Sequence, residues 1–397
     1  MTTQSKGLPV FEFLILCSVV FLAVCNNSVY YSLHVYLQGL GFSKSASGFI
    51  ISIYSLAGMF MYAAVSSFIS IYNAYRFMSA GMLLVVLGGS GYLFVNDFWL
   101  LCLLRVGQGV GMFMTLAPCV ALLVSMISTD NAGSAFSLYS TALLLPYSLL
   151  PDISERLVPH LGGSAMMYAA TASLIPVAFM MTLFLRWRTA RMHLREEKAK
   201  TGPSLRESYS NVARLSIMTV LAANGIYFMI FTGVFFLFQD FAHSRGIERA
   251  GYFFSVQMGV MIALRLFGGT VFDRFSKRGL IVAAFLINAV GFLMLMGLSD
   301  EAMLLPIAAV FGIGMGLSAP ALNSLMFTVS EPRFRSFNVN MMMFTVHMGS
   351  FLGPLLGGVM VDMFGYGGFL QMAAIGTGVA ALVFLFMSRG GLQVETH

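Results

Sequence analysis

Long apolar runs follow one another along almost the whole chain, and this feature limits the possible folds more than any other. A helix that crosses a bilayer needs roughly 20 mostly apolar residues. Twelve such runs can be placed, at residues 10–33, 48–70, 77–95, 98–127, 133–158, 164–185, 215–238, 250–272, 280–298, 302–328, 337–361 and 368–387. The sequence therefore predicts an all-α membrane protein with twelve transmembrane helices.

Composition and charge support a lipid environment. Hydrophobic residues make up 58% of the 397 residues and charged residues 10%, whereas soluble proteins carry roughly 25% charged residues. The net charge of +6 does not indicate nucleic acid, because the basic residues gather in a few loops between the apolar runs. The four cysteines lie inside apolar runs, without a metal-binding or disulfide spacing. We predict no cofactor, no metal and no nucleic-acid partner.

A basic loop at 186–214 separates two sets of six runs. We predict a six-helix bundle at 1–185, a cytoplasmic linker at 186–214 and a second six-helix bundle at 215–397. A regulatory or partner-binding role is the alternative for the linker. Most other basic residues fall on the linker's side, and such residues mark cytoplasmic loops.

This charge pattern also predicts how the chain sits in its membrane. Both termini are expected in the cytoplasm, which requires an even number of spans. The first run is expected to stay as a span, because no small-residue cleavage site closes it. We expect a monomer in a bacterial inner membrane, in contact with the lipid bilayer.

The two sets of runs repeat weakly at an offset of roughly 203 residues. Residues 109–112 (Gly-Val-Gly-Met) lie over 312–315 (Gly-Ile-Gly-Met), Pro151 over Pro354 and Gly162 over Gly365. Each set has an even number of runs, so the two sets share one orientation. This predicts two pseudo-symmetric bundles related by an axis along the membrane normal, with a solute site between them near the midplane.

Three motifs add a resemblance to a known family. Residues 269–278 read GTVFDRFSKR, similar to motif A of the major facilitator superfamily, with Ser276 in place of the second glycine. Residues 101–111 (LCLLRVGQGVG) are similar to motif B, and residues 349–358 (GSFLGPLLGG) have the spacing of motif C. The chain resembles this superfamily over essentially its whole length. The resemblance implies a secondary transporter that works by alternating access.

The resemblance is not symmetrical between the halves. Asp273 and Arg274 of motif A are expected to latch the cytoplasmic side, but the first-half stretch 66–76 keeps only an arginine. Motif C is usual in the fifth helix and an antiporter mark there. Here it lies in the eleventh, while the fifth carries Asp152, Glu155 and Arg156.

These fifth-helix charges are coupling or gating candidates. Asp152 and Arg156 can pair at a spacing of four residues. We expect a bridge from Arg105 to Glu155 or Asp152, because all three are predicted in the same outward third of the membrane. Such a carboxylate is either a proton carrier or part of a static outer gate.

Polar residues in the apolar runs supply the candidate cavity. In the first run a stripe at helical spacing forms either a cavity wall or a polar contact between helices. Arg105 is either a solute contact or a structural arginine paired with Gln108 or backbone. Arg265 shares a face with Gln257, and its arrangement before motif A resembles that of carboxylate transporters and also of efflux proteins. The cavity candidates are Asn27, Tyr31, His34, Gln38, Arg105, Asn224, Tyr227, Gln257, Arg265, Asn323, Asn340 and His347.

The predicted function is proton-coupled secondary transport of a small organic solute. Motifs A and B favour efflux, whereas the basic interior residues Arg105, Arg265 and His347 favour an anionic or zwitterionic solute. Uptake of a carboxylate or other anionic metabolite by proton symport is the alternative. No nucleophile–base pair, metal cluster or nucleotide loop indicates an enzyme.

Overall fold

The computed structural model describes residues 9–127, 132–190, 205–268 and 275–391, and no strand occurs among these residues. Two compact units divide the chain: Met1–Tyr30 with Phe60–Lys198, and Tyr31–Met59 with Ala199–His397. Residues 31–59 thus pack with the second unit, although they precede the basic loop. The predicted bundle boundaries at 185 and 215 stay a prediction.

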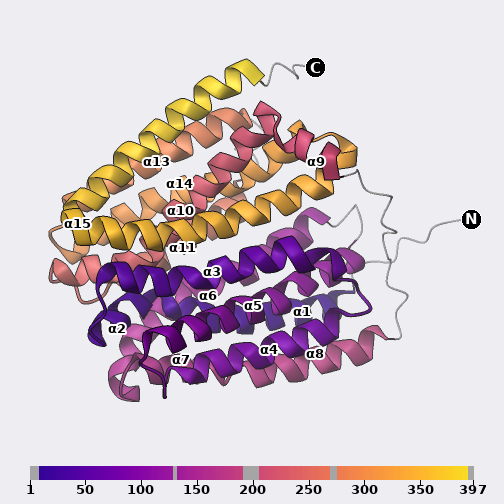
Figure 1. The fold of residues 1–397 in the computed structure, drawn as a ribbon, viewed down its shortest axis with the longest axis horizontal. Coiled ribbons are helices and arrows are strands. Elements are labelled where there is room, and N and C mark those ends of the chain that lie inside the picture. Colours follow the sequence, from indigo (N-terminus) through magenta and orange to yellow (C-terminus); the bar gives the residue numbers. More distant parts are fainter. Residues whose placement is uncertain (1–8, 128–131, 191–204, 269–274, 392–397) are drawn as a thin grey trace, which may run out of the picture. The chain divides into compact units, whose positions relative to one another are not determined.

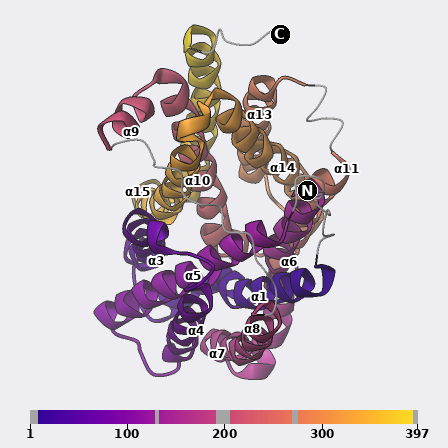
Figure 2. The same cartoon turned by 90° about the vertical axis from the view of Figure 1, so that its right-hand side faces the viewer.

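The first unit is built from long helices that pack along one another (Figures 1 and 2). Its helices are α1 (Val10–Ser28), α4 (Ala74–Gly91), α5 (Phe98–Met126), α6 (Ala132–Leu161), α7 (Ser164–Ala172) and α8 (Ile175–Thr189), with the 3-10 turn η2 at Ser66–Phe68. Helix α4 fits closely against α5, because a Cβ on Gly81 would lie 2.5 Å from the carbonyl oxygen of Gly111. Gly111, the third glycine of the motif B stretch, therefore has a packing role.

The second unit contains α15, in which two helices join at a break in the backbone. Its elements are α2 (Leu33–Gly39), α3 (Lys44–Val65, which continues past residue 59), α9 (Leu205–Val212), α10 (Leu215–Ser244), α11 (Gly251–Phe267), α13 (Lys277–Met296), η3 (Glu301–Met303), α14 (Leu304–Val329), η4 (Pro332–Phe334) and α15 (Arg335–Gly391). The backbone of α15 breaks at Gly365, where φ is 68°. The eleventh and twelfth predicted runs lie on either side of this break.

Glycines of the motif C stretch bring α15 against α10. A Cβ on Gly353 would lie 2.6 Å from the carbonyl oxygen of Met229, and one on Gly349 would collide with the carbonyl oxygen of Gly225. On another face of α15, Gly358 meets the backbone of Lys44 and Gly48 at the start of α3. Small residues allow this close approach of helices in lipid, which explains the glycine spacing without a transport role.

The repeat at 203 residues is visible in local geometry. Gly162 and Gly365 both have a positive φ, 88° and 68°. Pro151 and Pro354 both lie inside helices. A Cβ on Gly88 would meet the Gln108 side chain, and one on Gly291 would meet the ring of Phe311, at the same offset.

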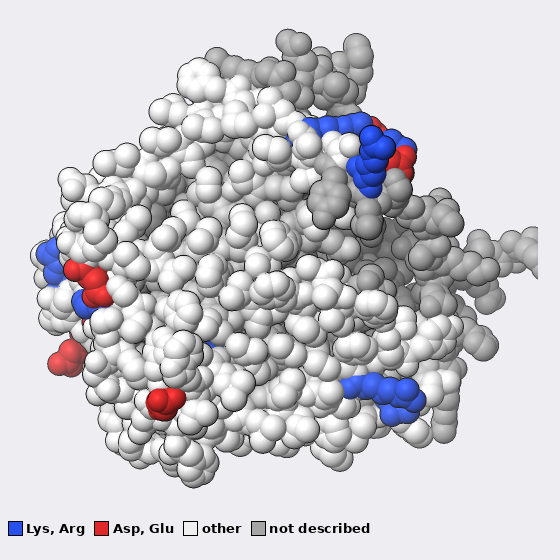
Figure 3. All heavy atoms as spheres, viewed as in Figure 1, with Lys and Arg blue, Asp and Glu red and all other residues white. Residues whose placement is uncertain are grey.

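The helices suit a membrane. Eight stretches of the described residues are long and apolar enough to cross one, and the shorter α11 is also apolar. Most of the surface in Figure 3 carries neither acidic nor basic side chains. The chain is thus all-helical in its described part, whereas the number of twelve spans stays a prediction.

The first predicted run is not one continuous helix. A 3-10 turn, η1 (Val29–Ser32), separates α1 from α2. Because a 3-10 turn holds 3.0 residues instead of 3.6, it changes the direction in which later side chains point. The predicted stripe stays a prediction, and the division between the two units falls inside it: Asn27 lies in the first unit, whereas Tyr31, His34 and Gln38 lie in the second.

Candidate functional site

Arg105 lies in a buried aromatic and amide cluster of the first unit. Its side chain is 1% exposed, and Nη1 donates a hydrogen bond of 3.0 Å to Oε1 of Gln108. The guanidinium carbon lies 5.2 Å from the centre of the Tyr30 ring. Gln108 also donates to the Tyr30 hydroxyl and accepts from Tyr92 at 3.3 Å. These contacts support the structural alternative for Arg105.

The other candidates of the first unit make local polar contacts. Nδ2 of Asn27 donates to the Tyr147 hydroxyl at 2.6 Å, joining α1 to α6. Asp152 and Arg156 pair at 2.8 Å on α6, with the arginine largely exposed. The proposed bridges from Arg105 to Asp152 or Glu155 stay a prediction.

Asn224 holds two helices of the second unit together. Its Nδ2 donates to the carbonyl oxygen of Met342 at 3.0 Å and to the Thr345 hydroxyl at 2.9 Å. Asn224 is 3% exposed. Both contacts use the Nδ2 group of the amide, so donation from Asn224 to a solute would require one of these bonds to break.

Tyr227 of α10 and Gln257 and Arg265 of α11 form a second group, in which two buried polar atoms have no hydrogen-bond partner among the described residues. Arg265 is half-buried, and its Nε is buried with no hydrogen-bond partner among the residues described. Tyr227 lies close enough to Arg265 for the two side chains to interact electrostatically. Two turns before Arg265, Gln257 donates from Nε2 to Sδ of Met315 at 2.9 Å, while its buried Oε1 has no partner within the described ranges.

The remaining candidates are less enclosed or lie elsewhere. Asn323 and Asn340 are exposed, and His347 is half-buried. A Cβ on Gly58 of α3 would lie 2.6 Å from the imidazole of His347, so any larger residue there would have to displace this ring. Asp273 and Arg274 lie outside the described residues.

One well-connected carboxylate, Asp240, is not among the residues predicted from the sequence. Oδ2 of Asp240, near the end of α10, accepts from the Tyr366 hydroxyl and from Nε2 of Gln38 at 2.8 Å. Nζ of Lys44 lies 3.3 Å from the same oxygen, and Nδ1 of His34 lies 3.5 Å from it. We call these five residues the Asp240 cluster.

A second polar contact lies one turn from Tyr366. Asp362 on α15 accepts from the backbone N–H of Ser45 at 2.7 Å and from the Ser45 hydroxyl. Lys44 also lies over the Tyr366 ring, 4.2 Å from its centre. The beginning of α3 is therefore attached to α15 by side chains as well as by the glycine contact.

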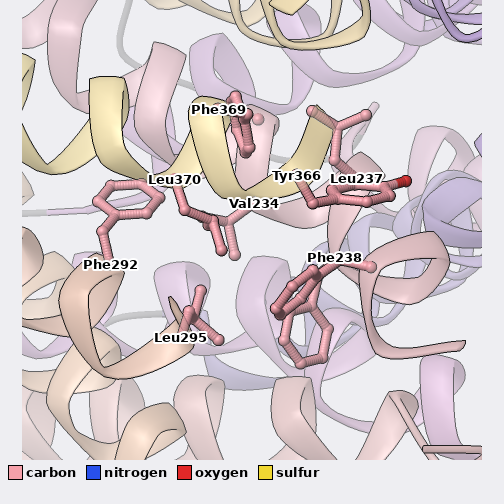
Figure 4. Close-up of a pocket in the computed structure, with 10 residues that line it drawn as sticks. Val234, Leu237, Phe238, Phe292, Leu295, Tyr366, Phe369 and Leu370 are labelled. Carbon is pink, nitrogen blue, oxygen red and sulfur yellow. The ribbon is translucent and has the colours of Figure 1, made fainter. Parts of the chain in front are cut away.

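One side of the Asp240 cluster is apolar. Tyr366 lines a cavity of about 10 Å³ with Leu237 and Phe238 of α10, Phe292 and Leu295 of α13, and Phe369 and Leu370 of α15. In Figure 4 its hydroxyl oxygen lies on the side away from Val234 and Leu370. This space holds at most about one water, so the tyrosine ring shields the carboxylate on that side.

The sequence contained a partial signal for this cluster. His34 and Gln38 were predicted as polar residues of the first run, but Asp240 lies two residues past the predicted end of the seventh run at 238. Helix α10 continues to Ser244. Among the described residues, no group of three or more His, Cys, Asp or Glu side chains is arranged to hold a metal ion.

Comparison with known proteins places the chain in a family. The model of the Major Facilitator Superfamily matches residues 15–330 and 254–394. Multidrug resistance protein MdtH of Yersinia pestis (strain Pestoides F) is 27% identical over 157 residues, and so is MdtH of Yersinia pseudotuberculosis serotype O:1b. These matches cover 36% of this chain and 39% of the relatives, so the similarity spans about two fifths of their length.

Solved structures share the fold over nearly the whole chain. The nucleoside transporter NupG, in a mutant form, has a TM-score of 0.81 at 15% identity and covers 95% of this chain and 99% of its own. A bacterial homologue of the human lysosomal transporter Spinster, in an inward-facing and unoccupied conformation, has a TM-score of 0.77 at 15% identity. It covers 99% of this chain and 100% of its own.

The chain belongs to the Major Facilitator Superfamily, whose model matches most of its length. This confirms the family that the motifs and repeat predicted.

Proposed function

We propose that the protein is a proton-coupled secondary transporter that exports a small organic solute of anionic or zwitterionic character. It would work by alternating access between two six-helix halves, twelve spans in all, as a monomer with both termini in the cytoplasm of a bacterial inner membrane. The basic loop at 186–214 supports this orientation. Asp152, Glu155 and Arg156 remain proposed gating residues of the fifth span.

The observation that carries the proposal is Arg265. An arginine in a membrane-spanning segment is costly and marks a functional site. Buried polar atoms are nearly always paired, yet Nε of Arg265 and Oε1 of Gln257 have no partner in the described part of the chain. A carboxylate or phosphate group of a solute would accept a hydrogen bond from the Arg265 guanidinium. An N–H or O–H group of the same solute would donate a hydrogen bond to Oε1 of Gln257.

Tyr227 adds a second contact of the right kind. It lies on α10, near enough to Arg265 for an electrostatic interaction. A phenol hydroxyl both donates and accepts, so this pair suits a solute with an acid group and a further polar group. The pair gives no such reason to bind a purely cationic drug.

The direction of transport rests on other support. MdtH, the similar relative, is named a multidrug resistance protein, and motifs A and B also favour efflux. Uptake of a carboxylate by proton symport is the second candidate, and Nε of Arg265, which has no partner among the described residues, favours it equally on chemical grounds.

Flux into proteoliposomes tests the proposal. Purified protein is given a panel of anionic, zwitterionic, neutral and cationic solutes, with the pH gradient imposed in both directions. Antiport accumulates solute when the interior is acidic, and symport when the exterior is acidic. If reversal of the gradient leaves the flux of every transported solute unchanged, proton coupling is rejected.

Variants of Arg265 test the solute site. Arg265→Ala is expected to abolish transport of an anionic solute, and Arg265→Lys to keep part of it, because lysine supplies the charge without the paired donors. Arg186→Ala, at an exposed arginine in the last turn of α8, is the matched control. Anionic flux that survives Arg265→Ala unchanged rules out this site.

A further inference from the structure

The Asp240 cluster joins helices from distant parts of the sequence. His34 and Gln38 come from α2, Lys44 from the first residue of α3, and Tyr366 from α15. All four reach a single oxygen, Oδ2 of Asp240 on α10. The carboxylate is thus the common partner through which α2 and α3 are attached to α10 and α15.

The charged form of Asp240 is needed for this arrangement. Gln38 and Tyr366 donate hydrogen bonds to Oδ2, and Lys44 supplies a full positive charge. A protonated carboxyl has one hydrogen of its own to place and no longer balances the lysine. The side chain is 19% exposed, so water replaces only part of what is lost.

His34 lies beside Asp240 in the same buried cluster. It is fully buried, and its Nε2 has no hydrogen-bond partner in the residues that the structure covers. Nδ1 lies 2.8 Å from Nε2 of Gln38 and 3.5 Å from Oδ2 of Asp240. With its proton on Nε2, the ring accepts from Gln38 at Nδ1, and with its proton on Nδ1 it donates to Asp240.

Other charged groups near Asp240 come from two further elements. Lys44 of α3 and Tyr366 of α15 contact it, and Asp362 of α15 interacts with both of these. With Asp240 and Asp362 ionised, Lys44 protonated and His34 neutral, the group carries one net negative charge. One added proton makes it neutral, and Lys44 then keeps only Asp362 as its counter-ion.

We propose that Asp240, with His34 beside it, is the proton-binding site of this transporter, and that protonation of Asp240 releases α2 and α3 from α10 and α15. Proton binding and helix separation are then linked, because the proton binds better to the released arrangement than to the attached one. The proposal rests on the proposed function only in naming the proton as the coupled ion.

Cross-linking measures the attachment directly, without a solute. Cysteines replace Ser45 and Asp362, which are in contact across α3 and α15, after the four native cysteines have been changed to alanine. The full chain in membranes is treated with a short thiol-specific cross-linker between about pH 8 and about pH 4, a range that reaches the ordinary pKa of an aspartate, about 3.9. The cross-linked fraction is expected to be high at the upper end and to fall as the pH is lowered.

Substitutions at Asp240 test whether this residue causes the pH dependence of cross-linking. In the same cysteine background, Asp240→Asn is expected to give a low cross-linked fraction with no pH dependence, while Asp240→Glu keeps the pH dependence. Asp300→Asn is the matched control, because Asp300 is an exposed cap of η3 and asparagine caps equally well. It should behave like the parent.

Two results would overturn the proposal. One is a cross-linked fraction that decreases on acidification in Asp240→Asn as it does in the parent. If His34→Gln then abolishes this decrease, the histidine rather than the aspartate is responsible for it. The other is proton-driven flux that is unchanged by Asp240→Asn. In the second case proton-coupled transport is retained and Asp240 is rejected as the proton-binding site. If cross-linking depends on pH but no solute shows proton-driven flux, Asp240 is retained as a proton-binding site and proton-coupled transport is rejected.

Discussion

Two helix pairs, α4 with α5 in the first unit and α13 with α14 in the second, share one contact but fill it with different chemistry. In both, a glycine of the first helix faces a large side chain of the second: Gly88 faces Gln108, and Gly291 faces Phe311. Gln108 belongs to the hydrogen-bonded Arg105 cluster. Phe311 instead packs against Phe292, with ring centres 5.1 Å apart.

The difference shows that the repeat preserves backbone geometry and not side-chain chemistry. At the offset of Arg105 the second unit has Ala308, which is fully buried. An apolar contact is therefore sufficient to pack this helix pair. A buried arginine costs desolvation that its hydrogen bonds only partly offset, so we infer that the first unit keeps Arg105 for a specific arrangement rather than for stability.

The largest effect is expected when the apolar contact is broken. Phe311→Ala should lower the free energy of unfolding by about 3 kcal/mol, because a fully buried ring is replaced by a cavity. Unfolding of the purified protein in mild detergent measures this loss. Phe311→Leu, which keeps most of the volume, should cost clearly less; equal losses would mean that packing does not hold this contact.

Breaking the polar contact between Gln108 and Arg105 should lower the free energy of unfolding by a smaller amount. Gln108→Leu takes one hydrogen-bond acceptor from Arg105 and should cost about 2 kcal/mol in the same unfolding measurement. Gln108→Glu keeps an acceptor for Arg105 and should be closer to the parent. If Gln108→Leu were as stable as the parent, the Arg105 cluster could not be what distinguishes the two helix pairs.

Adding a methyl group to each glycine sharpens the shared part of the comparison. Gly291→Ala would place a Cβ 2.8 Å from the Phe311 ring, and Gly88→Ala would press on Gln108. Each should cost about 1 to 2 kcal/mol through overpacking. Gly107→Ala is the control, since nothing lies within 4 Å of its added Cβ, and it should be neutral or slightly stabilising.

A double variant tests whether the steric contact is the cause. Phe311→Leu makes room beside residue 291, so its combination with Gly291→Ala should cost less than the sum of the two single losses. Additive losses would show that the methyl group acts elsewhere.

The sequence predicted the helices well because lipid requires long apolar runs with internal backbone hydrogen bonds. It also located the repeat and the Asp152–Arg156 pair, which depend on spacing alone. It missed the turn at η1, since Val-Tyr-Tyr-Ser at 29–32 contains neither glycine nor proline. No local signal announces such a break.

The Asp240 cluster was out of reach for a different reason. Its members come from residues 34–44, 240 and 366, and only the tertiary fold brings them together. Asp240 and Tyr366 also lie just outside predicted apolar runs, where a charged residue is usually read as part of a loop. A search for apolar runs therefore misses polar groups that lie at the ends of the helices.

The smallest effect is expected at an arginine–carboxylate contact on the surface, which tests whether burial makes the Arg105 cluster important. Glu331 accepts from Arg214 and, at 3.1 Å, from Arg333, and its side chain is 39% exposed. These hydrogen bonds hold the pKa of Glu331 below its ordinary value of 4.5. A carboxylate with a lowered pKa stabilises the fold above its ordinary pKa, and the stabilisation disappears as the pH falls through the lowered pKa.

Glu331→Gln should therefore shift the unfolding midpoint only slightly at neutral pH, and not at all in acid or high salt. A loss as large as that of Gln108→Leu would mean that charge pairing, rather than burial, sets the energy of these contacts, and the contrast between the two helix pairs would then need another cause.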